Sequence, residues 1–304
     1  MQITMFRLLV AGILMSTISY SLACTTFAIP TDKNIYIGKT RDMYPDIQAI
    51  EVVVPKNQDY KYIALVSKMQ SFLGYSFESK WVVRSGINQN NLAIVNMFGA
   101  NLVKQQDKSI QMRYDDGDDF MTYVLTKYKT VDSVIKDLPM IVKRYNYPEF
   151  YTIADNKSVA YIEVADNNQF KVKYSTDKSL VHTNHYLIDQ KINGVAITES
   201  TSSMMRFKRM TELLNSTNNY SITQLESFMS DHKAGDNTSI LRIGSPVTDP
   251  SSPRTLAHFI AEIPKNDNPA TVYIRLITTN QQFTLVLDSR FWKSFNKSKV
   301  ISFS

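Results

Sequence analysis

One cysteine is the residue with the clearest chemical potential in this sequence of 304 residues. Cys24 follows an apolar run at residues 8–15 and a small-any-small triplet at residues 21–23. Together these features are typical of a secretory signal peptide. The apolar run is too short to cross a bilayer, which takes about 20 residues. We therefore predict a signal peptide over residues 1–23 and an exported mature chain that begins at Cys24; the alternative is an uncleaved N-terminal anchor.

An N-terminal cysteine carries a thiol and a free α-amino group on one residue. Their reference pKa values are about 8.5 and about 7.7–8.0, so the amine can accept the thiol proton near neutral pH without help from a histidine. Cys24 is therefore a candidate nucleophile. Two alternatives are a non-enzymatic lipoprotein acylated on Cys24 and a cysteine without function. Lipidation is disfavoured because its signal usually has Leu or a similar residue three positions before the cysteine, where this chain has Ser21.

The composition excludes several classes of protein and site. Apolar residues make up 43% and charged residues 20%, which is ordinary for a globular protein and not for a disordered or fibrous one. The nine glycines lack the spacing of a phosphate-binding loop, and one cysteine excludes an intramolecular disulfide and an all-cysteine metal site. The net charge of +6 comes from scattered basic residues, so no nucleic-acid partner is expected.

The hydrophobic pattern predicts strands and helices in alternating blocks. The predicted strands are residues 25–29, 35–38, 52–54, 62–66, 92–98, 151–154, 159–164, 170–174, 256–263, 271–278 and 282–287. A helical stretch begins near Asp119, is split by an N-cap at Thr130, and ends or kinks at Pro139. Further helices are predicted at 200–214 and 222–229. This arrangement indicates an α+β fold in a single domain over residues 24–304.

Five short segments in order resemble a known family. They are CTTFA at 24–28, GKTRD at 38–42, GINQNNL at 86–92, HTNHY at 182–186 and MRF at 205–207. The set resembles the choloylglycine hydrolase/penicillin V acylase family and the related isopenicillin-N acyltransferase-like hydrolases. Asn91 stands where the family has a second glycine, and Met205 where it has a serine. The resemblance implies an N-terminal-nucleophile hydrolase with a four-layer αββα sandwich, and no metal or organic cofactor.

The resemblance also implies roles for individual residues. Cys24 would be the nucleophile, with its α-amine as the base. Asp42 would accept a hydrogen bond from the amine or thiol of Cys24. The side-chain amide of Asn184 and the backbone N–H of Asn96 would donate to the developing oxyanion. Arg206 would be a positive group near the nucleophile, favouring the thiolate.

The cation beside the nucleophile has two candidates. In the choloylglycine branch an arginine lies three residues before the aspartate, and this chain has Lys39 there. Arg41 lies directly before Asp42. Alternate residues of a strand share a face, so Lys39 and Arg41 would point the same way and either could serve. We favour Arg41 for its fixed charge and its fork of donors.

An acyl pocket and two polar segments complete the candidates. Apolar pockets with few polar groups are usual for such substrates. The residues expected to line one are Phe72, Tyr75, Met97 and Phe98; a core strand at 72–77 is the alternative. His182 and His185 are expected to make structural hydrogen bonds, with a zinc site as the alternative. The role of the segment at 231–240, which resembles one in the acyltransferase-like branch, is open.

These observations predict an exported single-domain amidase. Cys24 would attack the carbonyl of a linear N-acyl amide and form a thioester. An acyltransferase that uses the same thioester is the first alternative, and the Cys24-acylated lipoprotein is the second. The expected partner is a small-molecule N-acyl amide, without nucleic acid or stable membrane insertion. The acyl group, the leaving amine and a homo-oligomeric state are left open by the sequence.

Overall fold

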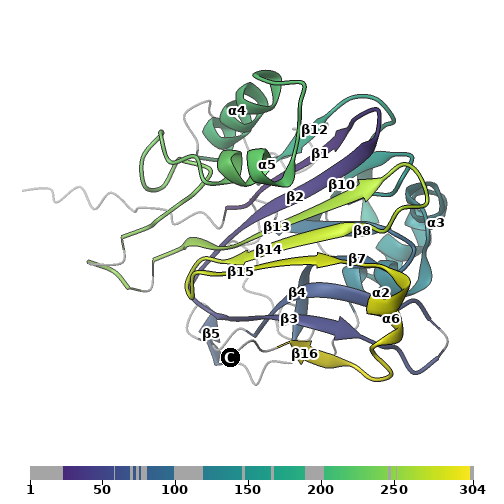
Figure 1. Cartoon of the computed structure of the whole chain (residues 1–304). Helices are drawn as coiled ribbons and strands as arrows, with labels where there is room; N and C mark the ends of the chain where they lie inside the picture. The colour runs from purple at the N-terminus through teal and green to yellow at the C-terminus, as the bar shows by residue number, and fades with distance from the viewer. Residues whose placement is uncertain are drawn as a thin grey trace, which may run out of the picture.

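The protein is a sandwich of two antiparallel sheets with helices on both outer faces (Figure 1). The computed structural model describes residues 23–57, 59–68, 71–72, 75–76, 81–98, 119–145, 148–165, 168–188, 202–245, 248–250 and 252–301. The predicted signal peptide lies outside the described residues except for Ala23, and that prediction stays a prediction.

The first sheet has six strands in the order β12-β1-β2-β13-β14-β15. Their bounds are Thr25–Pro30 for β1, Asn34–Met43 for β2, Leu180–His182 for β12, Arg254–Pro264 for β13, Thr271–Leu276 for β14 and Gln281–Val286 for β15. The central pair β2 and β13 is antiparallel and carries one β-bulge. Thr255 lies opposite Asp42 and Ala257 lies opposite Arg41, so Leu256 is the extra residue.

The second sheet has eight strands in the order β11-β10-β9-β8-β7-β4-β3-β16. Their bounds are Ile47–Val53 for β3, Tyr62–Lys68 for β4, Val82–Asn88 for β7, Ala93–Phe98 for β8, Glu149–Ala154 for β9, Val159–Val164 for β10, Phe170–Ser175 for β11 and Lys299–Ile301 for β16. A separate two-stranded ladder joins β5 (Ser71–Phe72) to β6 (Tyr75–Ser76).

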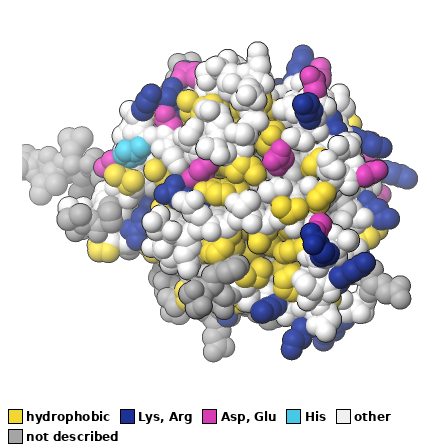
Figure 2. All heavy atoms as spheres, in the orientation of Figure 1, with side chains coloured by type: hydrophobic (Ala, Val, Ile, Leu, Met, Phe, Trp, Pro, Cys, Tyr) yellow, Lys and Arg dark blue, Asp and Glu magenta, His cyan; other side chains and the backbone are white. Residues whose placement is uncertain are grey.

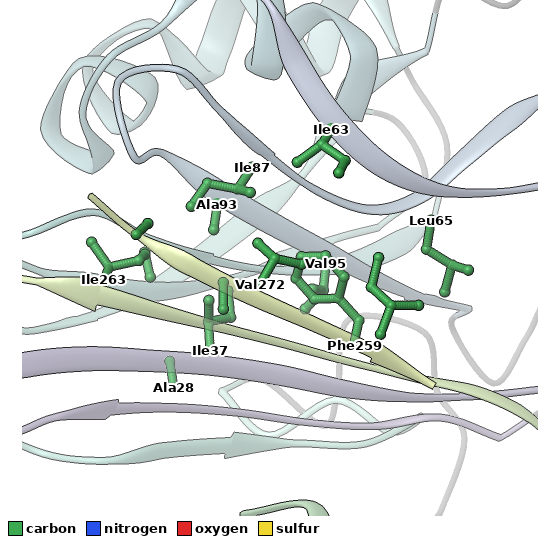
Figure 3. Packing of buried hydrophobic residues seen from close by; sticks show 14 of the residues in the cluster. Ala28, Ile37, Ile63, Leu65, Ile87, Ala93, Val95, Phe259, Ile263 and Val272 are labelled. Carbon is green, nitrogen blue, oxygen red and sulfur yellow. The ribbon is translucent and has the colours of Figure 1, made fainter. Parts of the chain in front are cut away.

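The main core lies between the two sheets, where alternate residues of each strand meet. Ile37 and Phe259 come from the first sheet, and Ile63, Leu65 and Val95 from the second, all fully buried (Figure 3). Because side chains alternate across a strand, the residues between them face the helices instead. This alternation decides which of the polar residues on β2 face the second sheet and which face the helices.

Helices cover the outer face of each sheet. The helices α2 (Phe120–Lys127) and α3 (Val131–Arg144) pack on the second sheet, and α4 (Ser202–Asn215) and α5 (Ile222–Met229) pack on the first (Figure 1). A short helix, α6 (Ser289–Lys293), precedes β16. The predicted αββα layering is therefore confirmed.

The start of α3 agrees with the sequence, and Pro139 does not end the helix. Thr130 is the N-cap, and its hydroxyl accepts from the Ser133 amide at 3.2 Å in a capping box. The helix continues through Pro139 to Arg144, so of the two outcomes predicted there the end is wrong and the kink stays a prediction. Pro139 lies on the exposed face, where water can satisfy the freed carbonyl, while Leu138 and its buried neighbours hold the helix against the sheet.

Most predicted strands are present, and the misses have local causes. The sequence analysis interpreted residues 86–92 only as a turn and predicted no strand at β7 or β12. Buried polar residues in β7 obscure its alternation. The following turn is held by Asn88, whose Oδ1 accepts from the amides of Asn90 and Leu92. Asn91 has φ 64°, the left-handed conformation that glycine supplies most easily, which explains why this position tolerates the replacement.

Charged side chains are spread over the surface. On the face in Figure 2, Lys and Arg side chains lie mostly around the rim, with Asp and Glu among them. Within the described ranges, no helix combines the length and the apolar character that crossing a membrane takes.

Candidate active site

Cys24 lies just before β1, at the end of the sheet sandwich, and is 3% exposed. It shares a small buried cluster with Met97 and Phe150 from the second sheet and with Tyr186. Its Sγ lies 3.9 Å from the backbone carbonyl of Asp42, a weak contact. The thiol is thus held in a mostly apolar setting into which a few polar groups converge.

Asn184 is placed beside Cys24 by the pairing of two strands. In the β1–β12 ladder Thr26 lies opposite His182, so the residue two beyond His182 comes alongside Cys24. Asn184 Oδ1 accepts from the Cys24 backbone nitrogen at 2.7 Å, and Asn184 Nδ2 donates to the Phe98 carbonyl at 2.8 Å. The amide therefore ties Cys24 to the end of β8, and both of its ends are engaged.

Arg206 reaches the same point from α4 and is fully buried. Its Nη1 donates to the Cys24 carbonyl at 2.5 Å and to Thr25 Oγ1 at 2.9 Å, while Nη2 donates to Asn184 Oδ1 at 3.2 Å. Burial lowers the pKa of Arg206 to about 10, so it remains a cation at neutral pH. The guanidinium fixes the backbone of the predicted nucleophile on its helix side.

Asp42 lies on the face of β2 that points toward the helices. Its Oδ1 accepts from Thr255 Oγ1 at 2.8 Å, whereas its buried Oδ2 has no hydrogen-bond partner among the described residues. Burial raises the pKa of Asp42, and the cations Arg242 and Arg206 oppose that rise. A buried carboxylate oxygen therefore lies on the same residue whose backbone carbonyl contacts Cys24.

Arg242 and Thr255 are site residues that the motifs did not identify. The segment at residues 231–240 leads to Arg242: Leu241 N donates to the Asp231 carbonyl at 2.9 Å, and Arg242 is the next residue. Two hydrogen bonds join Arg242 to Thr255. Arg242 N donates to Thr255 Oγ1 at 2.8 Å, and Thr255 N donates to the Arg242 carbonyl at 2.8 Å. The segment thus carries a cation to Asp42.

Lys39 and Arg41 share the inner face of β2, as the sequence predicts, but they have different partners. Lys39 Nζ donates to the Arg84 carbonyl at 3.0 Å and to Asn96 Oδ1 at 2.7 Å. Burial lowers the pKa of Lys39 to about 8, and the Cys24 thiol is the leading group that opposes this shift. Arg41 instead pairs with Asp46, with Nη2 to Oδ2 at 2.5 Å. Of the two cations on β2, the one with a described electrostatic interaction with Cys24 is therefore Lys39, the candidate that the sequence analysis ranked second.

Asn96 has a side chain committed to a polar network on the outer side of the second sheet. It accepts from Lys39, and its Nδ2 donates to Glu149 Oε1 at 2.7 Å. The oxyanion role implied for its backbone N–H stays a prediction. Glu149 is a residue that the sequence reasoning missed, because nothing near it in the sequence resembles a motif.

Of the four residues expected to line an acyl pocket, the structure describes the side chains of Met97 and Phe98. Met97 is buried beside Cys24, where Thr26 Oγ1 donates to its Sδ at 3.4 Å. Phe98 packs with the cluster around Met43 at the end of β2. Phe72 and Tyr75 pair in the β5–β6 ladder, and their side chains lie outside the described part of the chain.

The two histidines flanking Asn184 make hydrogen bonds inside the fold. His182 Nε2 lies 2.9 Å from Glu163 Oε1, and His185 Nδ1 lies 2.8 Å from Ser203 Oγ. Burial lowers the pKa of His185 to about 4, so it is neutral at physiological pH. Over the described ranges, no three His, Cys, Asp or Glu side chains are grouped so as to hold a metal ion.

Comparison with known proteins identifies the family. The model of the family described as acyl-coenzyme A:6-aminopenicillanic acid acyl-transferase matches residues 30–263, more than half of the chain. The chain belongs to this family. The resemblance drawn from the motifs is thereby confirmed, and Asp42, Asn96, Asn184 and Arg206 lie inside the matched range, which begins after Cys24. A search of curated proteins gives no significant match.

Solved structures give the same fold. The chain is similar to an arginine-to-leucine variant of conjugated bile acid hydrolase from Clostridium perfringens, with 14% identity and a TM-score of 0.55 over 92% of this chain and 97% of that one. A cysteine-to-alanine variant of conjugated bile acid hydrolase from the same organism gives 13% identity and a TM-score of 0.57 with the same coverage. At such identity the likeness shows the fold alone. The family places the chain among enzymes of amide hydrolysis or acyl transfer.

Proposed function

We propose that the protein is an exported hydrolase of linear N-acyl amides with Cys24 as its nucleophile. The observation that carries the proposal is the set of contacts around Cys24. Asn184 and Arg206 bind its backbone nitrogen and carbonyl, and a second buried cation, Lys39, interacts with its thiol. Two cations near one buried sulfur favour the thiolate, the form that attacks carbonyl carbon.

Removal of residues 1–23 is part of the proposal. While Ala23 is attached, the nitrogen of Cys24 is an amide and cannot accept a proton. Cleavage converts it to an amine that can take the thiol proton near neutral pH. The buried Asp42 Oδ2 would then accept from this amine or from the thiol, as the family resemblance implies. Burial of Cys24 argues against the lipoprotein alternative, because a lipid-bearing residue must reach the protein surface.

The proposed reaction has two halves. The Cys24 thiolate adds to the amide carbonyl, and the α-ammonium returns its proton to the leaving nitrogen as the C–N bond breaks. The acyl group remains as a thioester, which water cleaves to a carboxylic acid and the free thiol. Donors for the oxyanion would be Asn184 Nδ2 and the Asn96 amide. Nδ2 now donates to the Phe98 carbonyl, so it must share or give up that bond when substrate binds.

The test uses the exported protein. Intact mass and N-terminal sequencing should give residues 24–304 with a free Cys24 amine. That species should cleave members of a panel of N-acyl amides and accumulate an acyl-enzyme that hydroxylamine releases. A Cys24→Ala variant that is exported, folded and fully active would refute the mechanism.

Two further readouts separate the alternatives. Adding an acceptor amine distinguishes hydrolysis, which yields the free acid, from acyl transfer, which yields a new amide. A fatty-acyl mass on Cys24, or an exported chain starting at another residue, would contradict the proposal because the catalytic amine or thiol would be absent.

A further inference from the structure

The strands β7 and β8 part close to the proposed nucleophile. In the described part of the chain their ladder runs from Ile87 with Ala93 to Ser85 with Val95, and Arg84 and Asn96 follow this last pair. The Lys39 ammonium enters this gap from the inner face and bonds both sides, with the Arg84 carbonyl at 3.0 Å and Asn96 Oδ1 at 2.7 Å. The Lys39 side chain thus bridges the two strands where their backbone pairing ends.

The network continues beyond Asn96 on the outer side of the sheet. Asn96 Nδ2 donates to Glu149 Oε1 at 2.7 Å, and the Tyr151 hydroxyl donates to Glu149 Oε2 at 2.7 Å. All of these side chains are buried, with Asn96 5% and Glu149 6% exposed. Burying a carboxylate to this degree costs free energy unless the carboxylate is hydrogen-bonded and its charge is paired.

The space beside these groups is too small for a substrate. Arg84, Asn96, Glu149 and Tyr151 border a cavity of about 30 Å³ on the α2 side. That volume suffices for a water molecule, whereas ligand pockets span roughly 300–1,000 Å³. The polar residues therefore serve one another and Lys39, not a bound ligand.

We propose that Glu149 is a positioning residue that, through the side chain of Asn96, holds the Lys39 ammonium in the gap between β7 and β8 and so sets the reactivity of the Cys24 thiol. The inference rests on the proposed function for the role of Cys24, and it adds a residue that touches neither the sulfur nor the substrate.

The charges that face Lys39 give the sign of the effect. Cys24, just before β1, and Glu149 on β9 favour its protonated form, while Arg41 on β2 and Arg84 on β7 disfavour it. With burial, the balance leaves the pKa of Lys39 at about 8. Removing the negative charge of Glu149 lowers the pKa of Lys39 further, so the neutral fraction of Lys39 grows at neutral pH. The Cys24 thiol then interacts with a weaker positive charge and reacts more slowly.

The test uses the mature protein and exploits its single cysteine. Alkylation by iodoacetamide, followed by mass across a pH series, reports the reactivity of Cys24 with no substrate needed. Glu149→Gln should slow alkylation at neutral pH by about three- to tenfold, because a cysteine is less reactive once a neighbouring positive charge is weakened. The value of kcat should fall in parallel, with KM little changed.

Two variants and one control make the result specific. Tyr151→Phe leaves the Asn96–Glu149 bond in place and should shift the profile in the same direction by less, which keeps the proposal testable if Glu149→Gln does not fold. In a Lys39→Arg background, whose charge does not titrate, Glu149→Gln should no longer move the profile. Asp155→Asn neutralises another buried carboxylate, which caps α3 at 2.7 Å from Val131 N, and should leave alkylation unchanged.

Unchanged alkylation profiles in both folded Glu149→Gln and Tyr151→Phe would overturn the inference, as would an equal effect of Glu149→Gln in the Lys39→Arg background. Failure of the proposed function gives a different result. Glu149→Gln would still change the alkylation profile of Cys24, but the wild-type protein would cleave no N-acyl amide.

Discussion

Replacing Arg206 by methionine should separate activity from stability. The variant keeps an apolar stem in the buried space and removes the guanidinium. The Cys24 carbonyl then loses its 2.5 Å donor, and an unsatisfied buried acceptor costs about 1–3 kcal/mol. Against this, the variant no longer buries a cation whose pKa falls from 12.5 to about 10, a difference worth about 3 kcal/mol. Because the two effects nearly cancel, the free energy of unfolding should change by less than about 2 kcal/mol.

Activity should respond much more strongly. Arg206 holds the Cys24 carbonyl and Asn184 Oδ1, so its loss releases both the proposed nucleophile and the proposed oxyanion donor. The expected loss in kcat/KM on an N-acyl amide is about 10²–10³-fold, the size seen when an oxyanion donor is removed. The measurements are urea unfolding and steady-state kinetics on the same preparation of mature protein.

The matched control lies one turn along the same helix. Arg209 pairs with Asp231 at 2.6 Å and is 25% exposed, so Arg209→Met should cost less than about 1 kcal/mol and leave kcat/KM unchanged. The reasoning is refuted if Arg206→Met loses more than about 4 kcal/mol of stability, the range seen when a needed buried pair is broken. It is equally refuted if the variant remains fully active.

Three other changes test separate parts of the structure. Asn184→Asp keeps an oxygen for the Cys24 nitrogen but removes the amide donor, so kcat should fall by about 10²–10³-fold, and near wild-type kinetics would exclude the oxyanion role. The pKa of His185 is lowered from 6.5 to about 4, so between these pH values the unfolded chain binds a proton that the folded chain does not. The free energy of unfolding should therefore fall by roughly 3 kcal/mol as the pH drops from 6.5 to 4. Urea unfolding of His185→Asn over the same pH range should show a smaller loss. In Gly38→Ala the new Cβ would lie 2.3 Å from Phe27 Cζ, and thermal unfolding should report a loss of about 1–3 kcal/mol; a more stable variant would show that the ring moves freely.

The sequence was sufficient for the layers of the fold and for the cluster around Cys24. Alternation along the strands and the 3–4 spacing of the helices are local signals, and both survive in the folded chain. Asp42, Asn184 and Arg206 were each identified from motifs a few residues long. The structure brings all three to Cys24 through direct contacts or, for Asp42, through its backbone carbonyl.

The rest of the site depends on contacts between distant segments. The backbone of Arg242 is tied to Thr255, which also bonds Asp42, and Glu149 is linked to Lys39 through Asn96 on the neighbouring strand. The choice between Lys39 and Arg41 could not be made from their shared face. It depends on which of them meets Asp46 and which enters the gap in the second sheet.

The bulge at Leu256 makes one deletion in β13 different from the others. Thr255 meets Asp42 on the helix side and Ala257 faces the core, so the residues on either side of Leu256 already alternate as in a regular ladder. Deleting Leu256 would keep Thr255 opposite Asp42 and Phe259 in the core, with the loss of one buried side chain. Deleting Ile260 instead would force either residues 257–259 or residues 261–264 to exchange their core-facing and helix-facing sides. In a library of single-residue deletions, Leu256 should therefore be the position in β13 that tolerates loss best.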